Sequence, residues 1–228
     1  MNNRIKFSLN FNKFKTASNL DAKSFYTAIA SKDYDEKTKQ GFTDATLLGS
    51  VVSATYLEKI NAYYSIWDAN TGSMRKESYD MIKQVPFYID FTNQILAVEG
   101  TISNFNSIKR VLRNLYFAEF TYYQISFTPL EIIQFFSDDK ILVEIEQVTI
   151  IDFKYENMFL GTYTAKIIRP DIDILKHFSS NITKIKSVIA IDGFKISFVI
   201  SKNSSATIVC SEDIKIALLE YLSNKFRF

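Results

Sequence analysis

The sequence has very little of the residue types that catalytic and metal sites use most often. It contains one histidine, His177, and one cysteine, Cys210, among 228 residues. A single histidine excludes the HExxH zinc motif and any site built from several histidine ligands. A single cysteine excludes an intrachain disulfide. The six glycines form neither a GxGxxG nor a Walker A pattern, which excludes the familiar nucleotide-binding loops as well.

Long uncharged runs are also missing. The longest one covers residues 45–57, whereas a membrane-spanning helix needs about 20 apolar residues. Near the N-terminus, Arg4 and Lys6 occupy positions where a secretory signal would carry apolar residues. We therefore expect no membrane partner and a cytoplasmic location, which a lone thiol also suits.

Charge of one sign does not dominate either. The 27 basic and 25 acidic residues give a net charge of +2, which by itself indicates neither a nucleic acid nor a membrane partner. Apolar residues make up 47% of the chain, enough for a sizeable core. We predict one domain over residues 1–228, with a two-lobe organisation as the alternative and its seam near 157–171.

What the sequence does contain is alternation of apolar and polar residues, which predicts β-strands. The strongest hairpin signal is Asp192-Gly193, which separates apolar runs at 185–191 and 194–200. A two-residue turn there predicts four cross-strand pairs on one face: Ile191 with Phe194, Ile189 with Ile196, Ser187 with Phe198, and Ile185 with Ile200.

Helical spacing or capping residues mark five shorter segments, at 21–30, 104–116, 130–136, 172–178 and 213–223. Asp21 is the expected N-cap of the first, and Thr128 with Glu131 forms a capping box before the third. The fold class that follows is α+β: a mainly antiparallel sheet built from hairpins, with about four or five helices packed on it.

The helix predicted at 104–116 has two distinct faces. Its inward face carries four apolar residues at helical spacing: Ile108, Val111, Leu112 and Leu115. Lys109, Arg110 and Arg113 then lie outward, and none has an acidic residue four positions away to neutralise it. Such a cluster is a candidate surface for nucleic-acid phosphates. The alternatives are a solvated outer face and a contact with the acidic stretch at 131–156.

The sequence also offers two catalytic constellations. Asp139, Asp152 and Lys154 follow the pattern of a Mg²⁺-dependent nuclease, in which carboxylates hold the metal and the lysine orients water. Acid-x-Lys recurs at 35–37 and 213–215, however, so the same residues also fit a solvated strand face. A dyad of Cys210 with His177 is the other arrangement, although a cysteine at the end of an apolar strand is typical of an inert core thiol.

We therefore predict a non-enzymatic binding or assembly protein without cofactor or metal. It would act as a homo-oligomer or as a subunit of a complex, and it would contact nucleic acid through Lys109, Arg110 and Arg113. The alternative function is the nuclease that uses Asp139, Asp152 and Lys154.

Overall fold

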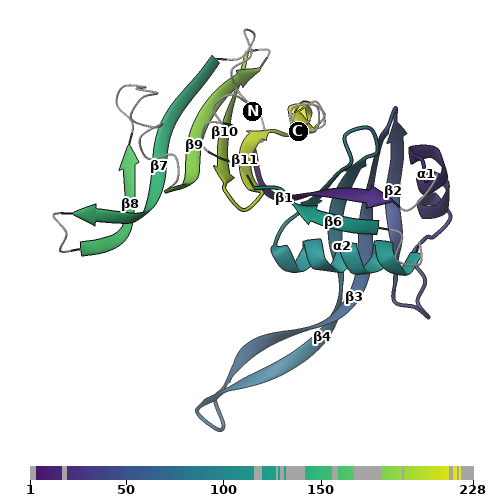
Figure 1. The fold of residues 1–228 in the computed structure, drawn as a ribbon. Helices are drawn as coiled ribbons and strands as arrows, with labels where there is room; N and C mark the ends of the chain where they lie inside the picture. The colour runs from purple at the N-terminus through teal and green to yellow at the C-terminus, as the bar shows by residue number, and fades with distance from the viewer. Residues whose placement is uncertain are drawn as a thin grey trace. The chain divides into compact units, whose positions relative to one another are not determined.

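The computed structural model describes residues 4–16, 20–115, 120–126, 128, 131, 142–155, 159–166, 181–191, 193–215, 218–219 and 221. The chain divides into two compact units (Figure 1). Unit 1 comprises Met1–Ala17 with Asn93–Phe228, and unit 2 comprises Ser18–Thr92. The predicted single domain over residues 1–228 and the alternative of two lobes with a seam near 157–171 both stay predictions, and part of 157–171 lies outside the described residues.

The predicted number of helices is wrong. Of the described residues, 64% lie in strands and 18% are helical, and they contain two α-helices instead of four or five. Strands dominate the described residues instead. Two long ones cover Val51–Asp68 and Ser73–Asp90, in keeping with the Tyr, Ile and Trp residues that they contain. Within the described part of the chain, neither helix has the length and apolarity needed to cross a membrane.

The predicted helices at 130–136 and 172–178 fall largely or wholly on residues that the structure does not describe, and the one at 213–223 is described in part. The predicted capping box is confirmed: Thr128 N–H donates to Glu131 Oε2 (2.6 Å), and Glu131 N–H donates to Thr128 Oγ1 (3.2 Å). The residues that would continue this helix are not described. At the C-terminus a 3₁₀ turn, η1 (Glu212–Ile214), precedes the buried side chains of Leu218 and Leu219.

Unit 2 consists of one helix and three antiparallel strands, in the order β2-β3-β4. Its elements are α1 (Ala22–Ala30), β2 (Gln40–Leu48), β3 (Val51–Asp68) and β4 (Ser73–Asp90). As predicted, Asp21 caps α1, because its Oδ1 accepts the N–H of Ser24 at 2.7 Å. The helix buries Phe25 and Ile29.

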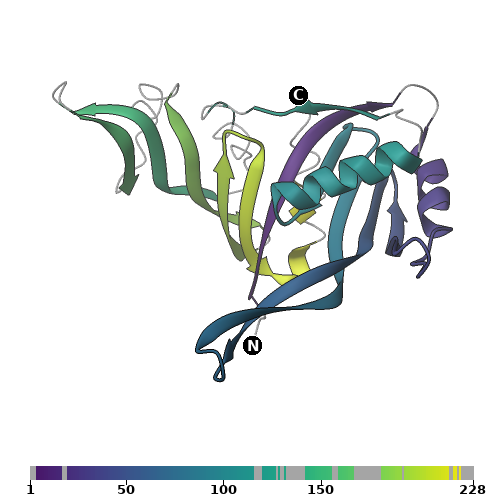
Figure 2. The ribbon, with the colours of Figure 1, turned by 90° about the horizontal axis from the view of Figure 1, so that it is seen from below.

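The β3–β4 hairpin is the longest feature of unit 2. Its two strands pair without a break from Val51–Asp90 to Asp68–Ser73. The half nearest β2 buries Val52, Tyr56 and Phe87. In both views, the other half extends beyond α1 and β2 as a bare two-stranded ribbon (Figures 1 and 2). We call residues 57–84 of this hairpin the ribbon.

Unit 1 contains the remaining strands and the second helix. Its strands are β1 (Arg4–Thr16), β5 (Ile95–Glu99), β6 (Phe120–Gln124), β7 (Leu142–Tyr155), β8 (Phe159–Lys166), β9 (Ile182–Ile191), β10 (Phe194–Ser201) and β11 (Ser205–Ser211). They follow the order β5-β1-β11-β10-β9-β7-β8, and β6 also pairs with β1. The helix is α2 (Ile102–Leu115).

The predicted hairpin at 185–200 is confirmed. All four predicted pairs occur in the β9–β10 register, and Gly193 adopts the positive φ (82°) that the turn requires. Ser187 and Phe198 are both buried, as are Ile189 and Ile196. Here the two-residue turn determined the register, and the alternation determined the inward face.

Helix α2 begins slightly earlier than predicted. Thr101 takes the capping position, since its Oγ1 accepts the N–H of Asn104 (3.4 Å). Three of the four residues predicted to face inward, Ile108, Val111 and Leu112, are buried together with Phe105, whereas Leu115 is half-buried.

Candidate functional site

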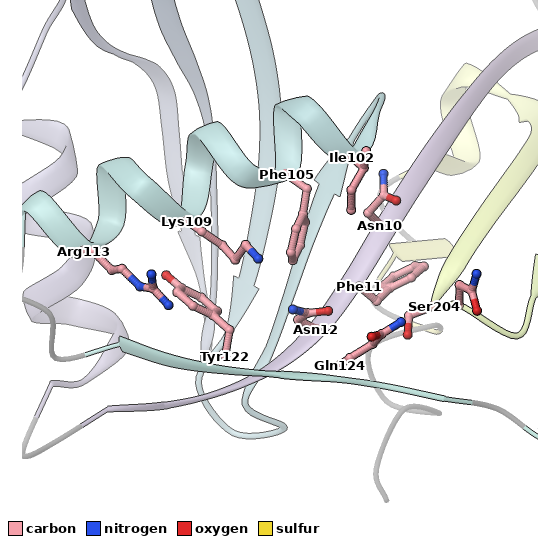
Figure 3. Close-up of a pocket in the computed structure, with 11 residues that line it drawn as sticks. Asn10, Phe11, Asn12, Ile102, Phe105, Lys109, Arg113, Tyr122, Gln124 and Ser204 are labelled. Atoms are coloured by element: carbon pink, nitrogen blue, oxygen red, sulfur yellow. The ribbon is translucent and has the colours of Figure 1, made fainter.

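A lysine and an arginine of α2 open onto a cavity of about 320 Å³ in unit 1 (Figure 3). Four segments enclose it: β1, α2, β6 and the turn between β10 and β11. The residues that line it are Asn10, Phe11, Asn12, Ile102, Phe105, Lys109, Arg113, Tyr122, Gln124, Asn203 and Ser204. The cavity therefore combines segments from the two ends and the middle of the chain.

Helix α2 contributes a row of side chains four residues apart. Phe105, Lys109 and Arg113 share one side of the helix because residues at i and i+4 lie one turn apart. Lys109 Nζ lies 5.0 Å from the ring centroid of Phe105, and Arg113 Cζ lies 5.4 Å from that of Tyr122. These distances allow cation–π attraction, which holds both cations at the cavity wall.

Strand β6 places Tyr122 opposite this row. Antiparallel pairing with β1 sets Tyr122 across from Phe14 and Gln124 across from Asn12. The Tyr122 hydroxyl is buried and has no hydrogen-bond partner among the described residues. Burial raises the pKa of Tyr122, and the charge of Arg113 only partly opposes that rise. The hydroxyl therefore stays protonated, and it can donate a hydrogen bond that no described residue accepts.

The turn between β10 and β11 brings a second unsatisfied hydroxyl. Ser204 is buried, and its Oγ finds no hydrogen-bond partner in the described part of the chain. Its carbonyl accepts the N–H of Phe11 at 2.9 Å, which fixes the turn against β1. Its φ of 58° is uncommon for serine. Nearby, Asn10 Nδ2 donates to the carbonyl of Gly100 at 2.8 Å.

The electrostatics of the cavity are one-sided. None of the described residues that line it is acidic, whereas Lys109 and Arg113 are both cationic. Burial and, secondly, the charge of Arg113 lower the pKa of Lys109. Two close cations and two unsatisfied hydroxyls suit a ligand with anionic oxygens.

Of the three basic residues predicted to bind phosphate, the structure brings two together. Lys109 and Arg113 line the cavity, whereas Arg110 is exposed and does not. The reason is that adjacent residues on a helix point about 100° apart. Sequence reasoning missed Tyr122, Gln124 and Ser204, because only the pairing of β1 with β6 and β11 places them here.

The residues of the alternative nuclease site are only partly described. Asp152 is exposed and adopts a positive φ (53°) where the pairing of β7 and β8 shifts register. Asp adopts a positive φ more readily than most residues, so the backbone conformation of Asp152 at this bulge does not require a catalytic role. Asp139 and the side chain of Lys154 lie outside the described residues. Among those that are described, no group of three His, Cys, Asp or Glu residues is placed to hold a metal. The nuclease stays a prediction.

Cys210 has the properties of a core thiol. It is buried in β11, and burial raises its pKa although Lys215 opposes the rise. A raised pKa disfavours the thiolate that a nucleophile requires. Its suggested partner, His177, lies outside the described residues.

Neither a protein-family model nor a curated protein matches this sequence. Function is therefore inferred from the cavity itself.

Proposed function

We propose that this chain is a non-enzymatic binding protein that holds single-stranded nucleic acid at the basic cavity of unit 1. In this proposal Lys109 and Arg113 contact a backbone phosphate, and the polar groups around them contact the adjoining nucleotide. One observation carries the proposal. Two cations and two unsatisfied hydroxyls line the same cavity, and none of its described lining residues is acidic.

The chemistry of the lining supports an anionic ligand that also has polar edges. Arg113 offers several donors in a fixed plane, and Lys109 offers a compact charge. Asn12, Gln124 and Asn203 add amides, which both donate and accept hydrogen bonds. Amides of this kind read the edges of bases, which phosphate contacts alone cannot do.

The size of the cavity supports a single nucleotide of a flexible strand. A volume of about 320 Å³ is near the lower end of the roughly 300–1,000 Å³ that ligand pockets occupy. A rigid duplex presents its phosphates on a convex surface, whereas a single strand can place one nucleotide in a hollow. We therefore expect single strands to bind more tightly than duplexes of the same length.

Binding of fluorescent oligonucleotides, measured by anisotropy over a range of salt concentrations, tests the proposal. The variant Lys109→Glu with Arg113→Glu should bind at least about tenfold more weakly than the wild type. Each phosphate contact contributes about 0.7 to the slope of log K against log salt for single strands. Lys109 and Arg113 share one phosphate, so the slope should fall by about 0.7. Circular dichroism establishes that the variant is folded.

The matched control is Lys32→Glu with Lys195→Glu, two exposed lysines outside the cavity that change the total charge equally. This control should keep most of the affinity. A second control is Arg110→Glu, on the same helix but away from the cavity. If Arg110→Glu weakens binding as much as the double variant does, the open helix surface is the site and the cavity is not. Failure of the wild type to bind any oligonucleotide would refute the proposal.

A further inference from the structure

The ribbon of unit 2 has two faces, and only one of them continues the buried face of the hairpin's other half. Because side chains alternate along a strand, Tyr64 and Tyr79 share the face that buries Val52 and Phe87. The opposite face carries Tyr63, Trp67, Met74 and Ile82, and we call it the outer face. These four side chains are 70%, 61%, 59% and 45% exposed.

Large side chains of this kind are characteristic of protein interfaces. Tyr, Trp and Met are enriched where proteins meet, and a row of them in water is unfavourable. On the outer face they follow one another along both strands, since Trp67 pairs with Met74 and Tyr63 with Ser78. A single exposed apolar residue is ordinary on a protein surface, but a row of four requires an explanation.

The charges on the outer face change sign about Ser78. Lys76 lies two residues before it and Asp80 two residues after it, roughly 7 Å away in each direction along the strand. Within one chain these two side chains are too far apart to pair. Asp80 contacts Lys59 at 3.4 Å, and a carboxylate can accept from a second cation.

We propose that the outer face of the ribbon binds the same face of a second copy of this chain, about a two-fold axis at Ser78. Such an axis sets β4 antiparallel to β4 of the second copy. Lys76 then faces Asp80 of the second copy, and Met74 faces its Ile82. On β3, Trp67 faces Lys59 of the second copy, and Tyr63 faces its own equivalent.

This complementarity is what selects a second copy over another partner. A two-fold contact must match a surface to itself, and here one axis pairs unlike charges, apolar groups, and a cation with an indole ring. The reversal of charge about Ser78 is what makes this match work. A face with charge of only one sign would instead repel its own copy.

The area predicts a weak, reversible dimer. A face of about ten residue positions is roughly 33 Å long at 3.3 Å per residue, and two strands with their side chains are about 10 Å wide. Two copies then bury on the order of 700 Å², which is below the 1,200–2,000 Å² of stable complexes. Half association at micromolar to submillimolar concentrations is the expected range.

Sedimentation velocity over about 1–300 μM protein tests the proposal with four samples: the wild type, each of two variants alone, and the two variants mixed. Lys76→Asp alone and Asp80→Lys alone each place like charges opposite one another, so each should associate at least about tenfold more weakly than the wild type. In an equimolar mixture, the two acids of the first variant face the two lysines of the second across the axis. The mixture should therefore regain association. Circular dichroism confirms that both variants are folded.

Three results would overturn the proposal. A wild type that stays monomeric over the whole range shows that another partner covers the outer face. A dimer that both variants leave unchanged uses another surface. Variants that fail to associate even when mixed show that charge pairing at Lys76 and Asp80 is not the contact. Trp67→Ala serves as an independent variant, since it leaves both charges in place and should also weaken association about tenfold.

Discussion

The β9–β10 hairpin of unit 1 and the β3–β4 hairpin of unit 2 are both continuous antiparallel pairs, but they differ in what covers them. In β9–β10, one face is buried from the Ile185–Ile200 pair to the Ile189–Ile196 pair, and only Phe194 beside the turn is exposed among its described side chains. In β3–β4, burial ends near Tyr56 and Val85, while pairing continues to Asp68 and Ser73. The difference teaches that strand pairing can continue without burial, whereas burial depends on other elements of the fold.

The two hairpins should therefore unfold differently. Strands with few buried contacts open locally at low free energy, whereas core strands open only when the whole unit unfolds. Cross-strand pairs such as Tyr64 and Tyr79, whose rings lie 5.6 Å apart, give the ribbon some stability of its own. Mutations in the ribbon should affect association more than folding.

The largest expected effect is the contrast between Phe198→Ala and Trp67→Ala. Phe198 is fully buried in β10, so its truncation leaves a cavity and should lower the free energy of unfolding by about 3–5 kcal/mol. Trp67 is mostly exposed, and its truncation should lower that free energy by less than about 1 kcal/mol. Urea denaturation of both variants measures the two values. Equal losses would mean that the ribbon is covered within one chain.

A smaller effect is expected when the hydroxyl group of Tyr122, but not that of Tyr63, is removed. Tyr122→Phe removes a buried hydroxyl that has no partner in the described part of the chain, so it should stabilise the free protein by about 1 kcal/mol. The same change should weaken oligonucleotide binding severalfold, because the ligand loses a donor. Tyr63→Phe is the control, since Tyr63 is exposed in the ribbon and should change neither quantity. Loss of stability in Tyr122→Phe would show that the hydroxyl is already satisfied.

Next come the turns of the two hairpins. Gly193 (φ 82°) and Gly72 (φ 61°) both adopt left-handed conformations, and a Cβ at either would meet no atom within 4 Å. Alanine therefore adds backbone strain alone, about 1 kcal/mol at each turn. Gly193→Ala should lower global stability by that amount, whereas Gly72→Ala should mainly increase hydrogen exchange at the ribbon tip. A global loss from Gly72→Ala would show that the ribbon unfolds together with the core.

The sequence predicted those features that depend on neighbouring residues. The turn at Gly193 determined the whole β9–β10 register, and the N-cap Asp21 located the start of α1. Helical spacing also identified the buried side of α2 through Ile108 and Leu112. In each case a local preference and the final fold agree.

Features that depend on distant pairings were missed. The cavity needs β6 beside β1, and Tyr122 and Phe14 are too far apart in sequence for any spacing to relate them. The sequence also did not reveal that β3 and β4 pair as far as Asp68 and Ser73. Local strand propensity is present there, but propensity alone does not determine how far the pairing extends.

The smallest effect is a difference in proton affinity between two lysines. Burial and Arg113 lower the pKa of Lys109, whereas a hydrogen bond to Asp80, followed by the charge of Glu36, raises that of Lys59. NMR of ¹³C-labelled lysine side chains should show Lys109 losing its proton at a lower pH than Lys59. Oligonucleotide affinity should fall as pH rises through the pKa of Lys109, because the phosphate loses a cation. Lys109→Arg keeps its charge above that pH and should retain affinity there. An identical fall with pH in this variant would show that Lys109 does not contact the phosphate.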